Sequence, residues 1–242
     1  TELVVTVGSG TPLAELEALL AEQGQCLPFE PPHFCWSSAG PAAASVATVG
    51  GMVAAGLAGP ARASVGGVRD YVLGAKLING LGQHLTFGGQ VMKNVAGYDV
   101  SRLMVGARGT LGLLTEVSLK VLPLASAEAT LCFPLEQQDA LEQLHRWGGE
   151  PLPLNASCWV MTPNPGSARP PEGLIVSDPA QPSLYVRLRG AVAAVEAACQ
   201  RMLAEVPGQR MDNAQTGKDW ALCRNQQLPF FSAPPADTVL WR

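Results

Sequence analysis

The hydrophobic pattern of the first half of the chain predicts short strands and helices that are separated by turns. Thr11 is a favourable helix N-cap, Pro12 a favourable first helical residue, and a leucine stripe follows until Gly24. Asn79-Gly80 is a strong hairpin signal between two apolar runs. The expected strands cover residues 3–7, 69–78, 83–87 and 113–122, and the expected helices cover 11–24 and 98–105.

The sequence pattern changes after residue 125, where glycine becomes rare and predicted strands alternate with predicted helices. Apolar alternation predicts strands over 129–133, 154–160 and 184–188, and amphipathic spacing predicts helices over 135–147 and 192–204. This order approaches the split βαβ, or ferredoxin-like, plan. We therefore expect an α+β protein with two domains, residues 1–125 and 126–242.

Composition narrows the class of protein. Hydrophobic residues make up 47% of the 242 residues and charged residues 15%, which excludes a disordered chain. The net charge of −4 argues against nucleic-acid binding, which usually requires an excess of basic residues. Residues 31–61 lack Asp, Glu, Lys and Arg, and this length could span a membrane, but Ala, Gly, Ser and Pro dominate it. We expect closely packed backbone there, not a membrane span.

The cysteines and histidines do not form a metal-binding pattern. None of the six cysteines is at CxxC spacing, and the three histidines are scattered. We expect no metal site and mostly buried free thiols in a reducing compartment.

Glycines in the uncharged segment are candidates for ligand binding. Gly50, Gly51, Gly56 and Gly59 have no side chain, so their backbone can approach a ligand, and N–H groups at a helix start can hold a phosphate. The alternative is tight packing between Ala/Gly-rich elements, and the spacing leaves both readings open. Neither a P-loop nor a Rossmann fingerprint is present, which disfavours an ordinary nicotinamide dehydrogenase.

Several segments together carry a family resemblance. They are ATVGGMVAAGLAGPARASVGGVRDYVLGAKLINGLGQ (47–83), KNVAGYD (93–99), GARGTLGLLTEVSLKVLP (106–123), and a terminal pattern of Trp220, Arg224 and Leu228-Pro229-Phe230-Phe231. In this order they resemble flavoproteins of the vanillyl-alcohol oxidase type with a PCMH-type FAD-binding domain, and most closely the FAD-binding subunits of bacterial glycolate oxidases (glycolate dehydrogenases).

The resemblance implies FAD between the FAD-binding domain and a ferredoxin-like α+β cap. The family positions near the diphosphate or ribityl chain of FAD correspond to Thr48, Val49, Gly50 and Gly51. The family positions that the flavin passes closely correspond to Gly56 and Gly59. Gly66, Asp70, Tyr71 and Val72 match the adenine-side segment, and Glu116 and Val117 match a strand beside the cofactor.

Two departures from the family pattern affect cofactor binding. Nothing precedes the strand at residues 3–7, where family members have a glycine-rich diphosphate loop, so we expect a fragment or a lost start, and impaired FAD affinity. Arg108 replaces the usual Glu of the EGT motif and could pair with a phosphate or with Asp99.

The residues for substrate oxidation are less clear. A 2-hydroxy acid needs a cation for its carboxylate, a base and a hydride acceptor. Arg187 and Arg189 share one strand face, and His33 follows two prolines, so these three are the candidates. A solvated or subunit-contact face for the arginines, and a structural role for the histidine, remain the alternatives.

Two functions follow from the resemblance. The chain could oxidise glycolate, or a similar short 2-hydroxy acid, to glyoxylate and pass electrons to an iron–sulfur partner subunit. Alternatively, it could be a non-catalytic FAD-binding or scaffold subunit beside a catalytic flavoprotein subunit. Either function implies a hetero-oligomer in the cytoplasm, peripheral on the inner membrane only through partners. An FAD-free structural protein is a third possibility.

Overall fold

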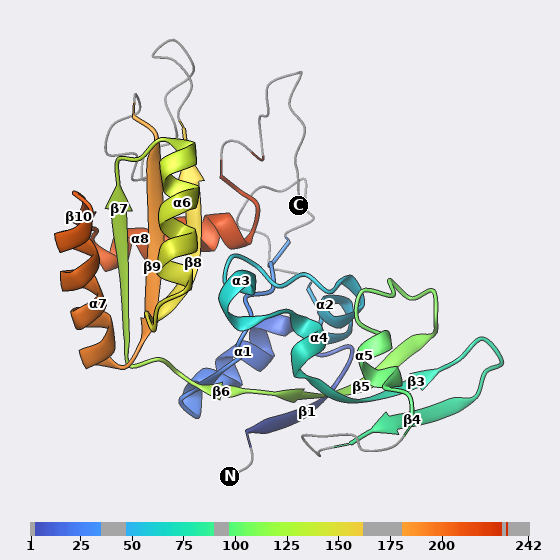
Figure 1. Cartoon of the computed structure of the whole chain (residues 1–242). Helices are drawn as coiled ribbons and strands as arrows, with labels where there is room; N and C mark the ends of the chain where they lie inside the picture. Colours follow the sequence, from blue (N-terminus) through green and yellow to red (C-terminus); the bar gives the residue numbers. More distant parts are fainter. Residues whose placement is uncertain (1–2, 35–46, 90–96, 162–180, 229–230, 232–242) are drawn as a thin grey trace, which may run out of the picture. The chain divides into compact units, whose positions relative to one another are not determined.

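The computed structural model describes residues 3–34, 47–89, 97–161, 181–228 and 231 (Figure 1). The chain divides into two compact units, Thr1–Leu124 and Ala125–Arg242. Cys35 and the segment 90–96, which includes most of the KNVAGYD motif, lie outside the described residues.

The first unit contains six strands and five helices in its described part. The strands are β1 (Val4–Gly8), β2 (Gln25–Cys26), β3 (Val72–Ile78), β4 (His84–Gly88), β5 (Leu113–Lys120) and β6 (Leu122–Pro123), and the helices are α1 (Leu13–Glu22), α2 (Val49–Ala55), α3 (Arg62–Val65), α4 (Val68–Tyr71) and α5 (Val100–Leu103). The main sheet has the order β1-β5-β3-β4 with antiparallel neighbours, and β2 pairs with β6. The hairpin expected at Asn79 is confirmed, because Ile78 pairs with His84.

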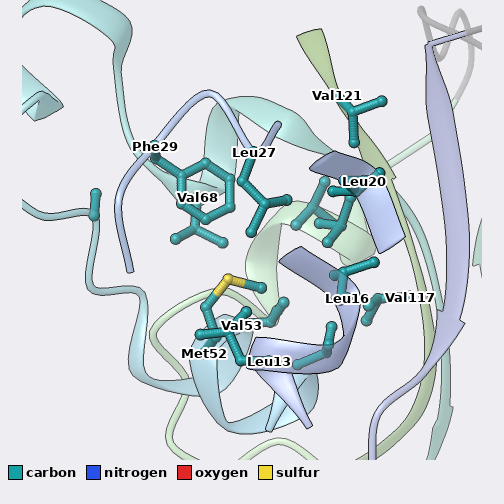
Figure 2. Packing of buried hydrophobic residues seen from close by; sticks show 14 residues of the cluster. Leu13, Leu16, Leu20, Leu27, Phe29, Met52, Val53, Val68, Val117 and Val121 are labelled. Carbon is teal, nitrogen blue, oxygen red and sulfur yellow. The ribbon is translucent and has the colours of Figure 1, made fainter. Parts of the chain in front are cut away.

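The core of the first unit lies between α1, α2 and one face of this sheet. Leu13, Leu16 and Leu20 of α1 are buried at helical spacing, as the leucine stripe predicted, whereas Leu19 of the same stripe is exposed. The buried leucines pack with Met52 and Val53 of α2 and with Val117 of β5 (Figure 2). Burying each such side chain contributes about 1.5–3 kcal/mol.

The strand expected over residues 69–78 begins later than predicted. Residues 68–71 form α4, and β3 starts at Val72. The reason is local: the Asp70 carboxylate accepts the Gly67 N–H at 2.8 Å, which caps the first turn of α4. This hydrogen bond competes with an extended backbone. The helix expected over 98–105 is also shorter, Val100–Leu103.

The uncharged segment contains a short helix in its described part. Thr48 caps the start of α2, and Gly56, at φ +66°, ends it in the left-handed conformation. Over the described residues, no helix is both long and apolar enough to cross a membrane.

The second unit has the predicted ferredoxin-like topology. Its strands are β7 (Ala127–Phe133), β8 (Leu154–Val160), β9 (Ser183–Gly190) and β10 (Gln209–Arg210), and its helices are α6 (Gln137–Gly148), α7 (Val192–Glu205) and α8 (Asn213–Arg224). The sheet order is β10-β7-β9-β8 with antiparallel pairs, so its strands follow the order 4-1-3-2 of the split βαβ plan.

The two faces of this second sheet are covered by different helices. Leu131 and Phe133 of β7 pack in the core with Trp147 of α6 and Val195 of α7. Thr130 points to the opposite face, where its hydroxyl accepts the indole N–H of Trp220 of α8 at 3.0 Å. A buried polar layer therefore separates α8 from the sheet.

We predict that Gly59→Ala destabilises the chain by about 1–3 kcal/mol more than Gly24→Ala. Both glycines have a left-handed φ, +68° and +65°, so both alanine variants share that cost. Only at Gly59 does a Cβ collide, 2.0 Å from the carbonyl oxygen of Glu30, whereas Gly24 has open space. Urea unfolding of the two variants measures the difference, and equal losses would contradict it.

Candidate functional site

Helix α2 buries one face and exposes the other. Val49, Met52 and Val53 are buried in the core, whereas Gly51 and Ala55, one turn apart, are exposed. The exposed strip therefore has no charge and no bulky side chain. A ligand can approach the α2 backbone closely along this strip.

The N–H groups at the start of α2 are already bonded within the protein. Val49 N–H donates to the Thr11 carbonyl at 3.0 Å, and Gly50 N–H donates to the Ser9 carbonyl at 2.8 Å. Gly51 N–H donates to the Thr48 hydroxyl at 3.1 Å. The sequence suggested that N–H groups at a helix start could hold a phosphate. These three N–H groups instead donate to acceptors in the loop before α1 and to the N-cap side chain.

Four of the candidate glycines have a packing reason within the protein. A Cβ on Gly50 would lie 2.6 Å from Ser9 Cβ, and one on Gly56 would lie 3.2 Å from the Gly106 nitrogen. Gly59 and Gly66 have positive φ, and a Cβ there would meet Glu30 and Asp70. Gly51 differs, since it is exposed and a Cβ would meet only the Thr48 hydroxyl, at 3.1 Å. Among the predicted glycines, Gly51 is therefore the one whose space is open to a ligand.

The loop at residues 106–110 lies against the C-terminal end of α2. Gly106 N–H donates to the Val53 carbonyl at 3.1 Å, and Arg108 N–H donates to the Ala54 carbonyl at 3.0 Å. Gly106, Arg108 and Gly109 are exposed. We call the exposed surface formed by Gly51, Ala55, Gly106, Arg108 and Gly109 the α2 platform.

Arg108 provides a cation for this platform. Its backbone is in the left-handed region at φ +52°. Asp99, the alternative partner from the sequence, instead pairs with Arg102, with Nε and Oδ2 3.1 Å apart, and caps α5. Within the described ranges no acidic side chain pairs with Arg108, so its charge is available to an anionic ligand.

Sequence reasoning missed Ser9. Its side chain is buried, and its hydroxyl oxygen has no hydrogen-bond partner among the residues that the structure describes. Such an unsatisfied buried hydroxyl is costly unless a further polar group meets it. The signal in the sequence was the short loop Gly8-Ser9-Gly10-Thr11 between a strand and a helix.

The adenine-side candidates gather around α3 and α4, where their side chains support the fold. Asp70 caps α4, and Val72 is buried. The Tyr71 hydroxyl donates to the Val65 carbonyl at 2.5 Å, and its ring contacts Phe29. Burial and the nearby Asp70 charge raise the pKa of Tyr71, so the hydroxyl keeps its proton. These residues can meet a ligand mainly through their backbone.

Glu116 and Val117 point to opposite faces of the first sheet. Val117 is 1% exposed in the core. Glu116 forms an ion pair with Lys76, whose Nζ lies 2.9 Å from its Oε1. Glu116 also lines a shallow hollow on the face away from the core, together with Thr6, Lys76, Thr86 and Ser118. The two side chains therefore cannot contact the same part of a cofactor.

The three candidates for substrate oxidation all have partners inside their own units. His33 Nε2 lies 2.8 Å from Glu17 Oε2 of α1. Arg189 binds Glu128 with Nε and Oε2 2.7 Å apart. Arg187 is 2% exposed, donates to Asn155 Oδ1 at 2.7 Å and lies 4.8 Å above the Trp220 ring. In the described part of the chain, no three His, Cys, Asp or Glu side chains gather into a possible metal site.

We predict that Arg187→Ala costs about 3 kcal/mol of stability, because it leaves a cavity and an unsatisfied Asn155 amide. Arg189→Ala is the matched control on the same strand face. The ion pair between Arg189 and Glu128 is partly exposed, so we expect its loss to cost less than about 1 kcal/mol of stability. Denaturant unfolding measures both, and a full-stability Arg187→Ala variant would contradict this structural role.

Comparisons with known proteins agree with the motifs in the sequence. Residues 1–88 match a family model for an FAD binding domain. Glycolate oxidase subunit GlcE of Escherichia coli is 43% identical over 242 residues, 100% of this chain and 58% of that protein. Glycolate oxidase subunit GlcD of Bacillus subtilis is 37% identical over 103 residues, 43% of this chain and 22% of that protein.

A solved structure supports the fold. An alkyldihydroxyacetonephosphate synthase matches with a TM-score of 0.65 at 18% identity, over 93% of this chain and 44% of that one. The chain spans 58% of the length of GlcE and smaller shares of the other curated relatives named above. The predicted α+β fold class is confirmed, and so is the predicted cofactor, FAD. Residues 1–88 are thus similar to the FAD binding domains that this family model describes, and the whole chain is similar to the glycolate oxidase subunit GlcE.

Proposed function

We propose that this chain is an FAD-binding subunit of a glycolate oxidase (glycolate dehydrogenase) complex. The observation that carries the proposal is the 43% identity to GlcE along all 242 residues. Both units of the chain take part in that match, so it is not limited to a shared cofactor domain. The activity itself is carried over from a longer relative.

The α2 platform is where we propose that the chain contacts FAD. Its exposed small residues let an extended ligand approach the backbone, and Arg108 can neutralise one charge of a diphosphate. These features fit an anionic dinucleotide better than they fit an apolar ligand. When bound, FAD supplies a ring that accepts a hydride.

In this proposal the chain's own residues bind and orient the cofactor. Arg108 would bind a phosphate of FAD through its charge, and Gly51 and Ala55 would leave room for the ligand. The fixed N–H groups at the start of α2 keep this surface rigid, because each already has an acceptor in the loop before α1 or in the cap. A rigid surface loses little entropy when it binds a ligand.

A second candidate is supported by the partners of the substrate-oxidation residues. His33, Arg187 and Arg189 are each engaged by residues of their own unit. A carboxylate-binding cation or a free base would have to leave those partners first. This favours a non-catalytic FAD-binding or scaffold subunit, with glycolate oxidised to glyoxylate on a flavoprotein partner subunit.

The partners proposed for the complex are a catalytic flavoprotein subunit and an iron–sulfur subunit. The relation to GlcE and GlcD, both named as glycolate oxidase subunits, supports a multi-subunit assembly. The iron–sulfur subunit follows from the family resemblance and from the lack of CxxC spacing in this sequence. A cytoplasmic complex that meets the inner membrane through its partners remains the prediction for its location.

We predict that Gly51→Leu weakens FAD binding at least about tenfold, roughly 1.4 kcal/mol, while the stability of the chain is kept. The new side chain occupies the exposed strip of α2, and leucine favours a helix more than glycine does. Quenching of flavin fluorescence on titration gives the affinity. Urea unfolding gives the stability.

Ala18→Leu is the control for this variant. It adds a leucine to an exposed position of α1, outside the α2 platform and outside the adenine-side segment. FAD affinity should be unchanged in Ala18→Leu. If Gly51→Leu and the unmodified chain bind FAD with equal affinity, the cofactor does not bind at the α2 platform. If the unmodified chain does not bind FAD at all, the cofactor-binding proposal is rejected.

A further inference from the structure

Two cysteines that are in no disulfide lie toward the face of the second sheet that α8 covers. Cys158 belongs to β8 and pairs across the sheet with Tyr185, two residues from Arg187. Cys223 belongs to the last turn of α8. The Cys158 and Cys223 side chains are close enough to interact, although 64 residues lie between them in the sequence.

Buried side chains hold the helix with Cys223 against the strand with Cys158. Trp220, three residues before Cys223, donates its indole N–H to the Thr130 hydroxyl at 3.0 Å. The Arg187 guanidinium lies 4.8 Å from the centre of the same indole ring. Residues three apart share a helix face, so Trp220 and Cys223 both point toward the sheet. The contact of the two thiols is therefore set by the packing of α8.

We propose that Cys158 and Cys223 are a reversible oxidation site, at which a disulfide links β8 to α8. The other described cysteines lack this arrangement. Cys132 and Cys199 are buried at 2% and 3% exposure, and Cys26 lies in the first unit with Sγ 3.9 Å from the Pro123 carbonyl. Both residues of the proposed pair are intermediate in exposure, between the buried and the exposed side chains.

The oxidant in this proposal is a small disulfide such as oxidised glutathione. The thiolate of Cys223 attacks one sulfur of the small disulfide, whose S–S bond breaks, and the departing thiolate takes up a proton. The Cys158 sulfur then attacks Cys223, the Cys158–Cys223 bond forms, and the second small thiol leaves with the other proton. Two cysteine thiols are oxidised, and one small disulfide is reduced to two thiols.

The order of attack follows from the surroundings of Cys158. The hydrogen bond to Cys223 and burial raise the pKa of Cys158 above that of an ordinary thiol. Cys158 therefore keeps its proton. This leaves Cys223 as the sulfur that reacts first and Cys158 as the one that resolves the mixed disulfide.

The disulfide should stabilise the second unit. It closes a loop that runs from β8 through β9, α7 and β10 to α8, and so restricts the unfolded chain. The bond also fixes α8 over Arg187 and Thr130. We expect the melting temperature of the oxidised chain to rise by several degrees.

The test is oxidation of the whole folded chain with oxidised glutathione, followed by thiol alkylation, proteolysis and mass spectrometry. We expect a peptide that links Cys158 to Cys223, the loss of two free thiols per chain, and full reversal by dithiothreitol. Cys26→Ser, the matched control, should still lose two thiols. In Cys158→Ser the glutathione should stay on Cys223 as a mixed disulfide.

Three outcomes would overturn the proposal. They are a stable glutathione adduct on Cys223 in the unmodified chain, a disulfide between any other two cysteines, and retention of all thiols while circular dichroism shows a folded chain. A linked peptide that forms equally in urea would also overturn it, because the folded contact would then not direct the reaction.

Discussion

The contact between Gly50 and Ser9 fixes the position of α2. Gly50 N–H donates to the Ser9 carbonyl at 2.8 Å, and Ser9 N–H donates to the Thr115 carbonyl at 2.9 Å. A side chain at position 50 would meet Ser9 Cβ at 2.6 Å, so the approach requires glycine. Through these bonds the start of α2 is joined to the loop after β1 and to β5. The direction of its exposed strip, and hence of the proposed FAD surface, depends on this contact.

Much of the fold could be predicted from local patterns. The leucine stripe of α1 and the hairpin at Asn79 follow from side-chain period and turn chemistry, and so does the split βαβ order of the second unit. The start of β3 could not be predicted, because the residues before it form the short helix α4, whose first turn is capped by a hydrogen bond that the Asp70 carboxylate accepts from the Gly67 N–H. The alternation of apolar and polar residues, which predicts strands, contains no information about a side chain that caps a helix locally.

The candidate site was harder to predict, because its geometry depends on contacts between residues far apart in sequence. Gly50, Gly59 and Gly51 have similar sequence surroundings, yet only the structure shows that Ser9 and Glu30 occupy the space at the first two. The pattern of β9 correctly placed Arg187 and Arg189 on one face of the strand. It could not show that α8 covers the Arg187 end with Trp220, while Arg189 stays half-exposed beside Glu128.

The central claim is that the α2 platform is the surface at which this chain meets FAD. Amide hydrogen exchange of the whole chain with and without FAD tests it most directly. The account predicts added protection in peptides that cover α2 and residues 106–110, and little change along β4. Protection confined to the hollow of Thr6, Lys76 and Thr86 on the other face of the sheet would contradict it.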